Sequence, residues 1–369
     1  MVCISSVDFG REVLRGVRAW CTEHKGTRMV VVSEAGYIPG MHIPSEPFDC
    51  LVIQYSGVTE LEAVRKCFPN LVVTSNREPA EGFARVLNDE RAIGRMGAEY
   101  LMSLGYRTLA FLNPDRLQFA RERAAGFEEA VRRAGLECRE FSANSAPETA
   151  QVLARLMELA GPVAVMAASD LHARWILEAL EDPVGVVPGQ LAVLGVDDDS
   201  LQNALSPIPI STVALSGERI GYEAAGLGMR LAAGEPFHEA PIPIPPKHVI
   251  ARRSTDAIAI KDRLVARILR LMRERMADFP DAGALIREIG VPRRTLEVRF
   301  NKATGQTLAH ELASARIQRA RELLSSTDLS IKEIAFLVGF SEPRMLSLVF
   351  KRVAGELPSE YRVRVRPGH

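Results

Sequence analysis

An internal repeat near the C-terminus constrains the fold of this 369-residue chain more than any other feature. One copy is ALIREIGVPRRTLEVRFNKATG at residues 284–305, and the other is EIAFLVGFSEPRMLSLVFKRVAG at residues 333–355. Each copy predicts a short apolar helix, a turn at a glycine and a second helix that ends in Phe-x-[Lys/Arg]-x-x-Gly. Gly290 and Gly339 lie between apolar residues, as expected where a helix ends in a left-handed cap. The repeat therefore predicts two helix-turn-helix units.

The second helix of each copy, at about residues 293–302 and 342–353, is predicted to separate its side chains onto two faces. The residues expected to face inward are Leu296, Phe300 and Ala303, and then Leu346, Val349, Phe350 and Val353. The residues expected to be exposed are Arg293, Arg294, Glu297, Val298 and Asn301, and then Arg344, Ser347, Leu348 and Lys351. Exposed sets of this kind contact base edges and phosphates. The alternative is a helical packing repeat with a solvated basic face, although such arrays need about three repeats or more.

Charge is distributed unevenly along the chain, although the formal net charge is zero. Residues 261–369 contain 21 lysines and arginines against 13 aspartates and glutamates, whereas residues 1–260 contain 25 against 33. A basic part joined to an acidic part favours a nucleic-acid-binding module over a membrane protein. Charge alone is equally compatible with a solvated basic face.

The segment RIQRARELLSSTDLSIKEIAFLVGFSEPRMLSLVFKRVAGELPSEYR, residues 316–362, resembles the AraC-type transcription regulators. Its Ala-x-x-x-Gly-Phe turn, Phe-Lys pair and closing Pro-x-x-Tyr-Arg carry the resemblance, which covers about the last hundred residues. It implies two helix-turn-helix subdomains, bridged by one helix, that enter the major groove of double-stranded DNA roughly 34 Å apart. The base-facing positions that the resemblance implies are Arg294, Glu297, Val298, Arg344, Ser347 and Leu348. The chain departs from the family pattern at Pro343, Met345 and Leu346, and proline is acceptable in a first helical turn.

The first 250 residues alternate short apolar segments with amphipathic helical patterns. The expected strands include residues 51–55, 71–75, 108–112, 163–169 and 191–197, and the expected helices include 90–104 and 119–134. This alternation predicts α/β units on parallel sheets. Prolines recur through residues 239–256 and exclude a helix there, so this stretch marks the end of the first domain.

Residues 1–256 resemble the ligand-binding core of LacI/GalR-type repressors, which is itself similar to periplasmic sugar-binding proteins. The segments that carry the resemblance include ARERAAGFEEAVRRAG at residues 120–135, AASDLHARWILEAL at residues 167–180 and LAVLGVDDDSL at residues 191–201. The resemblance implies two α/β lobes that close over a small molecule. With the AraC-type segment included, the entire chain resembles the xylose operon regulators, which implies a sugar effector, xylose or a related pentose.

Together these observations predict a sensor domain of two α/β lobes at residues 1–250, a linker at residues 251–261 and an all-helical DNA-binding domain at residues 262–369. The two helix-turn-helix units are expected at about residues 282–303 and 331–353. A homodimer is expected, because linking two DNA-binding modules raises avidity without new contacts.

Polar residues at the ends of the expected strands are candidate ligand contacts, because ligands bind outside the carboxyl ends of strands in open α/β sheets. The strand-end candidates are Asp8 with Phe9, Ser169 with Asp170, and Asp197. The resemblance to the LacI/GalR family adds Arg123, near the start of an expected helix, and implies that Arg123, Ser169 and Asp197 contact the ligand. Carboxylates accept hydrogen bonds from hydroxyls and a guanidinium donates two, so this set suits a polyol. The plainer alternatives are a turn cap at Asp197, a surface ion pair at Arg123 and a helix N-cap at Ser169.

Other classes of protein find little support in the sequence. Gly-x-Ser-x-Gly, P-loop and Gly-x-Gly-x-x-Gly motifs and metal-spaced His/Cys sets are absent, so no enzyme activity, cofactor or metal is expected. The odd number of cysteines, five without Cys-x-x-Cys spacing, predicts buried thiols in a reducing compartment. Without a signal peptide or 18 consecutive apolar residues, the chain is expected to be cytoplasmic rather than a transport protein. A non-sugar effector such as a purine or an amino sugar, and the choice between activation and repression, stay open.

Overall fold

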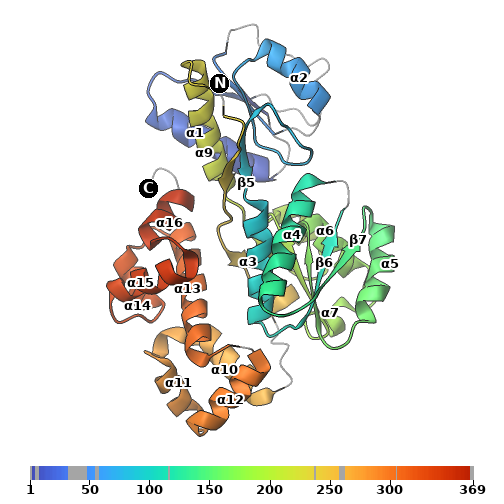
Figure 1. Cartoon of the computed structure of the whole chain (residues 1–369), viewed down its shortest axis with the longest axis vertical. Coiled ribbons are helices and arrows are strands. Elements are labelled where there is room, and N and C mark those ends of the chain that lie inside the picture. The colour runs from blue at the N-terminus through green and yellow to red at the C-terminus, as the bar shows by residue number, and fades with distance from the viewer. Residues whose placement is uncertain are drawn as a thin grey trace.

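The computed structural model describes residues 2–4, 8–31, 48–54, 58–114, 117–236, 238–256, 262–304 and 306–365. These residues form two α/β lobes and a helical domain that lies along one side of them (Figure 1). The predicted fold class is confirmed, because both lobes are built on mostly parallel sheets and the C-terminal part is entirely helical.

The first lobe is a parallel sheet of order β11-β5-β4-β3-β1-β2 covered by three helices. Its strands are β1 (Val2–Ile4), β2 (Val30–Val31), β3 (Leu51–Ile53), β4 (Leu71–Val73), β5 (Ala84–Asn88) and β11 (Ile242–Ile244). Its helices are α1 (Asp8–Glu23), α2 (Val58–Cys67) and α9 (Gly217–Ala232). Every residue of β3 and β4 is buried, which explains why their sequences are continuously apolar rather than alternating.

The second lobe is a sheet of order β12-β10-β9-β8-β6-β7, in which only the β10–β12 pair is antiparallel. Its strands are β6 (Thr108–Asn113), β7 (Cys138–Ser142), β8 (Val163–Ala167), β9 (Leu191–Val196), β10 (Ser211–Val213) and β12 (Val249–Ile250). Its helices are α3 (Glu90–Ser103), α4 (Gln118–Arg133), α5 (Ala146–Met157), α6 (Asp170–Glu178), α7 (Pro183–Val186) and α8 (Ser200–Leu205). The chain passes between the lobes after β5, after β10 and between β11 and β12.

The second lobe continues further along the chain than the sequence indicated. A short 3-10 helix, η1 (Arg253–Thr255), follows β12, and Ser254 and Thr255 are fully buried. The hydroxyl of Ser254 donates to the carbonyl of Val193 in β9 at 2.6 Å and accepts from the amide of Ser211 at 2.8 Å. The expected boundary at residue 250 is therefore too early, and the first part of the expected linker at 251–261 belongs to the second lobe.

The helical domain consists of α10 (Arg263–Glu274), η2 (Met276–Asp278), α11 (Ala282–Ile289), α12 (Arg293–Thr304), α13 (Leu308–Ser326), α14 (Ile331–Leu337), α15 (Pro343–Ala354) and α16 (Pro358–Val365). The first helix-turn-helix unit is α11 with α12, and the second is α14 with α15. Gly290 and Gly339 have φ values of 72° and 89°, the left-handed conformation that the sequence predicted for both turns.

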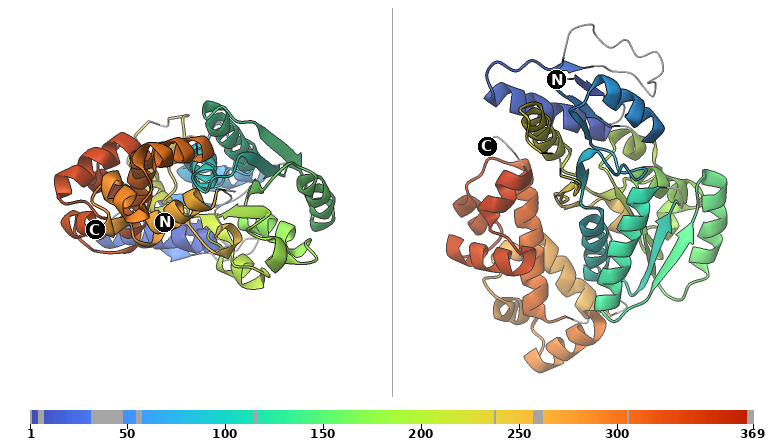
Figure 2. Two further views of the ribbon diagram at one scale, coloured as in Figure 1. Left: turned by 90° about the horizontal axis from the view of Figure 1, so that it is seen from below. Right: turned by 45° about the horizontal axis from the view of Figure 1, so that its top comes forward.

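The long helix α13 contributes to the cores of both units. Leu308 and Leu312 at its start pack in the first core, which contains Leu296 and Phe300 of α12. Ile317, Ala320 and Leu324 pack in the second core together with Leu346 and Phe350 of α15. Viewed from two further directions, the helical domain lies beside both lobes (Figure 2), and hydrogen bonds join α13 to His248 and Val249.

Candidate functional site

A buried cluster of charged side chains lies in the second lobe around Arg123 of α4. Arg123 is only 3% exposed, and its Nε donates to Glu90 Oε2 at 2.6 Å. Its Nη1 donates to the carbonyl of Ala168 at 2.5 Å and lies 3.8 Å from Asp197 Oδ1. The ring of Phe119 stacks on the guanidinium, with its centroid 4.6 Å away. The structure thus brings Arg123 and Asp197 together, and the burial of Arg123 excludes the alternative of a surface ion pair.

Glu90 is a member of this cluster that sequence reasoning missed. It is the first residue of α3, where the preceding Asp89 caps the helix by accepting from the amide of Ala92 at 2.9 Å. Glu90 is 3% exposed, and burial raises its pKa to about 7 although the charge of Arg123 lowers it. The available signal was an Asp-Glu pair at the start of the expected helix 90–104, at the point where the chain enters the second lobe.

Two glycines explain why Glu90 and Arg123 meet. A Cβ added to Gly94 of α3 would lie 1.9 Å from the backbone oxygen of Arg123, and one added to Gly126 of α4 would lie 2.1 Å from that of Arg91. These separations are far below van der Waals contact, so α3 and α4 approach at distances that only glycine permits. The start of α3 is thereby placed against the middle of α4.

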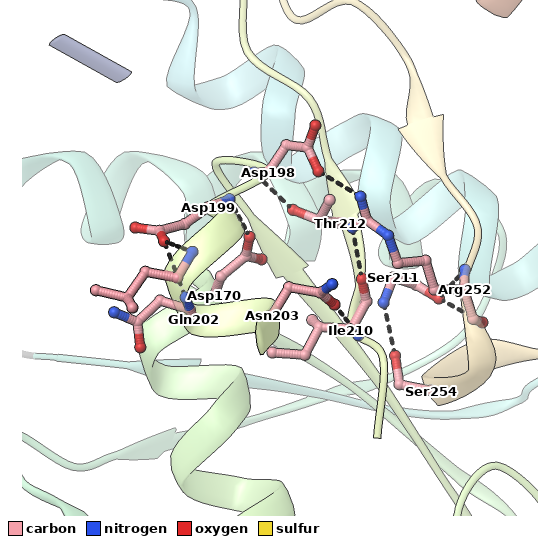
Figure 3. A network of polar contacts seen from close by, with 11 residues as sticks. Asp170, Asp198, Asp199, Gln202, Asn203, Ile210, Ser211, Thr212, Arg252 and Ser254 are labelled. Atoms are coloured by element: carbon pink, nitrogen blue, oxygen red, sulfur yellow. Dashed lines mark hydrogen bonds and ion pairs between the residues drawn. The ribbon is translucent and has the colours of Figure 1, made fainter. Parts of the chain in front are cut away.

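Asp197 is presented by a loop that adopts an unusual backbone conformation. Asp197 and Asp198 follow β9 with φ values of 111° and 57°, a region that aspartate tolerates better than most residues. The loop is held by hydrogen bonds from the amide of Asp199 to Asp170 at 2.9 Å and from the amide of Asp198 to Thr212 at 3.2 Å (Figure 3). The side chain of Asp197 is 32% exposed, so its carboxylate is available to a ligand.

The remaining aspartates of this region have bonding partners in the protein. Arg252 donates to Asp198 Oδ1 at 2.6 Å, and Asp199 Oδ1 caps α8 by accepting from the amides of Leu201 and Gln202 (Figure 3). Asp170, which the sequence offered as a ligand contact, is 1% exposed and accepts from the backbone of the loop. Its burial raises its pKa well above the usual range. Asp170 therefore holds the loop through Oδ2, whereas its Oδ1 is buried without a hydrogen-bond partner among the described residues.

Ser169 precedes α6 at the edge of the cluster. Its Oγ lies 2.7 Å from Nδ1 of His172, and both side chains are buried. Burial lowers the pKa of His172 to about 4, so the imidazole is neutral at physiological pH. Ser169 occupies the N-cap position of α6, but its side chain makes no cap hydrogen bond. Its hydroxyl is instead oriented by His172.

The cluster lies close to the first lobe. The amides of Gln118 and Phe119, at the start of α4, donate to the carbonyls of Arg77 and Asn76 in the first lobe, both at 2.9 Å. Phe9 of α1 packs against the cores of both lobes. Asp8 begins α1, but its side chain lies outside the described residues. The helix that carries Arg123 is therefore in direct contact with the opposite lobe.

The second candidate site is the exposed surface of α12 and α15. All five α12 residues that were predicted to be outside are exposed: Arg293, Arg294, Glu297, Val298 and Asn301. Arg293 Nε donates to Glu297 Oε1 at 2.8 Å, an exposed pair of the kind that contributes little to stability. Val298 is 60% exposed, which is unusual for an apolar residue and leaves it free to contact an apolar group such as a thymine methyl.

The α15 surface agrees with the prediction at three positions and differs at two others. Arg344, Leu348 and Lys351 are exposed, and Ser347 is half-buried, with its Oγ donating to the carbonyl of Pro343 at 3.3 Å. Val353 was expected to face inward, but it is 40% exposed. The prediction for Val353 is wrong because its side chain points to the cavity between the helical domain and the second lobe.

Membrane and metal sites were searched over the described ranges. No helix there is long and apolar enough to span a bilayer. Within the same ranges, no group of three or more His, Cys, Asp and Glu side chains is arranged to hold a metal ion.

Two family models match this chain. A periplasmic binding protein-like domain matches residues 98–255, and a helix-turn-helix domain matches residues 285–364. The chain is 32% identical over 216 residues to the xylose operon regulatory protein of Haemophilus influenzae, covering 58% of this chain and 56% of that protein. It is 33% identical over 207 residues to the protein of the same name from Escherichia coli K12, covering 56% and 53%. The matched region thus spans about half the length of these curated relatives.

Solved structures show similarity in fold. A structure described as a xylose-binding transcription activator matches with a TM-score of 0.60 at 23% identity, covering 98% of this chain and 97% of that one. A LacI transcriptional regulator from Rhodococcus matches with a TM-score of 0.56 at 21% identity, covering 70% and 98%. The chain therefore carries a periplasmic binding protein-like domain followed by a helix-turn-helix domain, and over 98% of its length its fold is similar to that of the xylose-binding transcription activator.

Proposed function

We propose that this protein is a DNA-binding transcription regulator controlled by a small sugar, with xylose or a related pentose as the first candidate. The observation that carries the proposal is the buried Arg123 cluster, which lies against the opposite lobe in a chain that also exposes two recognition helices. DNA binding also assigns the protein to the cytoplasm. The curated relatives named for a xylose operon support the choice of sugar.

The chemistry of the cluster suits a polyhydroxyl ligand. The carboxylate of Asp197 accepts hydrogen bonds from hydroxyls, and the guanidinium of Arg123 can donate to a ring or hydroxyl oxygen. Hydrogen bonds to charged groups contribute about 1.5 to 3 kcal/mol each. Two such bonds therefore make the affinity for a sugar much higher than the affinity for an analogue that lacks both hydroxyls. Phe119, which already stacks on Arg123, supplies an apolar surface beside these polar groups.

Control requires that the sugar favour one arrangement of the lobes. A ligand shifts such an equilibrium only by the difference between its affinities for the two arrangements, commonly about 1 to 3 kcal/mol. We propose a homodimer as the working form, because two linked helical domains bind paired half-sites with higher avidity.

Calorimetric titration with D-xylose, other pentoses, hexoses and purine bases tests the effector. We expect saturable binding of one sugar by the wild type, and loss of that binding in Arg123→Ala and Asp197→Ala. Arg132→Ala is the matched control, because this α4 arginine is exposed and pairs only with Glu128 in its own helix. Binding of a purine instead of a sugar would replace the proposed effector, and unchanged binding in both cluster variants would move the site elsewhere.

We expect sugar affinity to depend on pH through Asp197. Partial removal from water raises the pKa of this carboxyl to about 6, opposed by the charge of Arg123. Because the ionised carboxylate is the hydrogen-bond acceptor, protonation competes with the sugar, and affinity falls by up to about tenfold per unit below pH 6. Titration with D-xylose at pH 8, 7, 6 and 5 measures this. In Asp197→Asn the affinity should be lower and the pH dependence weaker, and equal affinities of the wild type at pH 7 and pH 5 contradict the assignment.

A further inference from the structure

The first helix-turn-helix unit contacts the second lobe through Arg107. This residue lies between α3 and β6 and is half-buried. Its Nη2 donates to the carbonyl of Thr304, the last residue of α12, and lies 3.5 Å from the carbonyl of Ala303. A cation at this position satisfies carbonyls that the end of a helix leaves without partners. The recognition helix α12 is thereby fastened to the second lobe.

The second unit is fastened elsewhere. Arg219 of α9, in the first lobe, donates from Nη1 to the carbonyl of Val363 in α16 at 3.1 Å. The hydroxyl of Tyr361 donates to the carbonyl of Lys247, which lies in the segment that passes from β11 to β12. The ring of Tyr361 packs edge-on against Phe350 of α15, with centroids 5.4 Å apart. The recognition helix α15 is therefore linked to the first lobe and to the passage between the lobes.

The bridging helix α13 contacts the passage at His248 and the second lobe at Val249, the first residue of β12. Ser325 Oγ lies 2.8 Å from Nδ1 of His248, and Gln318 Nε2 donates to the carbonyl of Val249 at 3.4 Å. Gln318 and Ser325 lie in the second half of α13, which packs in the core of the second unit. The first half of α13 packs in the core of the first unit.

The two regions of attachment are separated by a cavity of about 1210 Å³. Met96 and Tyr100 of α3 line it on the side of the second lobe, and Ala313, Ile317 and Val353 line it on the side of the helical domain. A continuous interface would fill this volume with interdigitating side chains, as protein interiors do. In the described part of the chain, hydrogen bonds instead join the helical domain to the lobes at separate places: at Arg107, at Arg219 and Lys247, and through α13 at His248 and Val249.

We propose that the two helix-turn-helix units are anchored separately, the first to the second lobe through Arg107 and the second to the first lobe and the passage through Arg219 and Tyr361. A change in the angle between the lobes then shifts one recognition helix relative to the other within a single chain. The inference extends the proposed function: the effector acts on the spacing inside each DNA-binding domain, in addition to any rearrangement between subunits.

The length of α13 limits how the two units can respond when the lobes move. Its 19 residues span about 28 Å at 1.5 Å per residue. A helix of this length cannot follow two lobes that move apart, so one anchor must loosen or the units must rotate about α13. Either response alters the placement of α12 and α15, which must match successive turns of DNA.

Hydrogen exchange of the full-length protein, without sugar or DNA, tests the separate anchoring. In Arg107→Ala we expect exchange to become about tenfold faster in residues 300–312, since a hydrogen bond to a charged group is lost, with little change in residues 343–365. In Arg219→Ala we expect the reverse pattern. Arg132→Ala again serves as the control and should change neither region.

Each alternative result is informative. Faster exchange over the whole helical domain in either variant would show a single rigid attachment and overturn the proposal, as would unchanged exchange in both variants. Arg107→Lys, which retains a donor of similar length, should restore part of the protection in residues 300–312, so that a local defect in the second lobe is distinguished from loss of the anchor. Because neither ligand is present, this outcome does not depend on whether sugar control is correct.

Discussion

Replacing Arg123 with methionine should lower the free energy of unfolding of the second lobe by about 3 to 5 kcal/mol at pH 8, the range measured when one partner of a buried ion pair is removed. At this pH Glu90, whose pKa beside Arg123 is about 7, is ionised in the wild type. Removing Arg123 takes away the charge that lowers this pKa, so the 3% exposed carboxyl must either stay ionised without its partner or take up a proton, and either costs stability. The carbonyl of Ala168 would lose its donor as well. Methionine fills much of the arginine volume, so the loss is electrostatic rather than a cavity effect.

Urea unfolding followed by fluorescence measures this loss. The chain contains two tryptophans, and in a Trp20→Phe background Trp175 of α6 reports on the second lobe alone. The double variant Glu90→Gln/Arg123→Met should recover much of the stability, because no charge stays buried. The loss in Arg123→Met should also shrink at pH 5.5, where Glu90 is protonated in the folded variant. If the double variant is as unstable as the single one, packing and not charge holds this site together.

The second large expected effect is a loss of DNA-binding affinity when one arginine is removed from each recognition helix. Arg294 and Arg344 are exposed on the two recognition helices, and one good contact between an arginine and a base contributes about 1 to 3 kcal/mol. Contacts at well-separated base pairs add, so Arg294→Ala/Arg344→Ala should lose about 2 to 6 kcal/mol, or roughly 30-fold to 10⁴-fold in affinity. Because both side chains are exposed, the folded state should be almost unaffected.

Fluorescence anisotropy at fixed salt measures this change, with a duplex selected from a random pool by the wild-type protein. The double variant Arg132→Ala/Arg133→Ala removes the same charge from an exposed face of α4 and is the matched control. A random-sequence duplex should show a smaller loss, because only electrostatic attraction is removed there. Equal losses on the selected and random duplexes would mean that these arginines contact phosphates and do not specify sequence.

The sequence predicted the features that are determined within a short segment, and it missed those that depend on contacts with distant parts of the chain. The two glycine turns and the inward positions of Phe300 and Phe350 follow from spacing within one helix-turn-helix copy, and the structure has them as predicted. Val353 was misplaced because a neighbouring domain, not its own helix, determines its surroundings. Ser254 was assigned to a linker because its partner, Val193, lies in β9, about 60 residues earlier in the chain.

The ligand cluster shows the same division. Asp197 could be proposed because it follows an expected strand, and Arg123 because it matches a ligand-contacting position of the family that the sequence resembles. Glu90 could not be found in this way, because its role depends on the close approach of α3 and α4 at Gly94. The sequence could not show that Asp170 also holds the loop, since its hydrogen bond to the amide of Asp199 forms only once the loop is folded.

The sharing of α13 by two cores bears on how the DNA-binding domain folds. Leu312 completes one core and Leu324 the other, so each unit holds only half of a helix that both require. A fragment that ends after α12 would lack the apolar cover of its own core, and one that starts at α14 would expose Phe350. Neither unit should therefore fold as an isolated fragment, and half of the domain cannot be exchanged between regulators as an independent module.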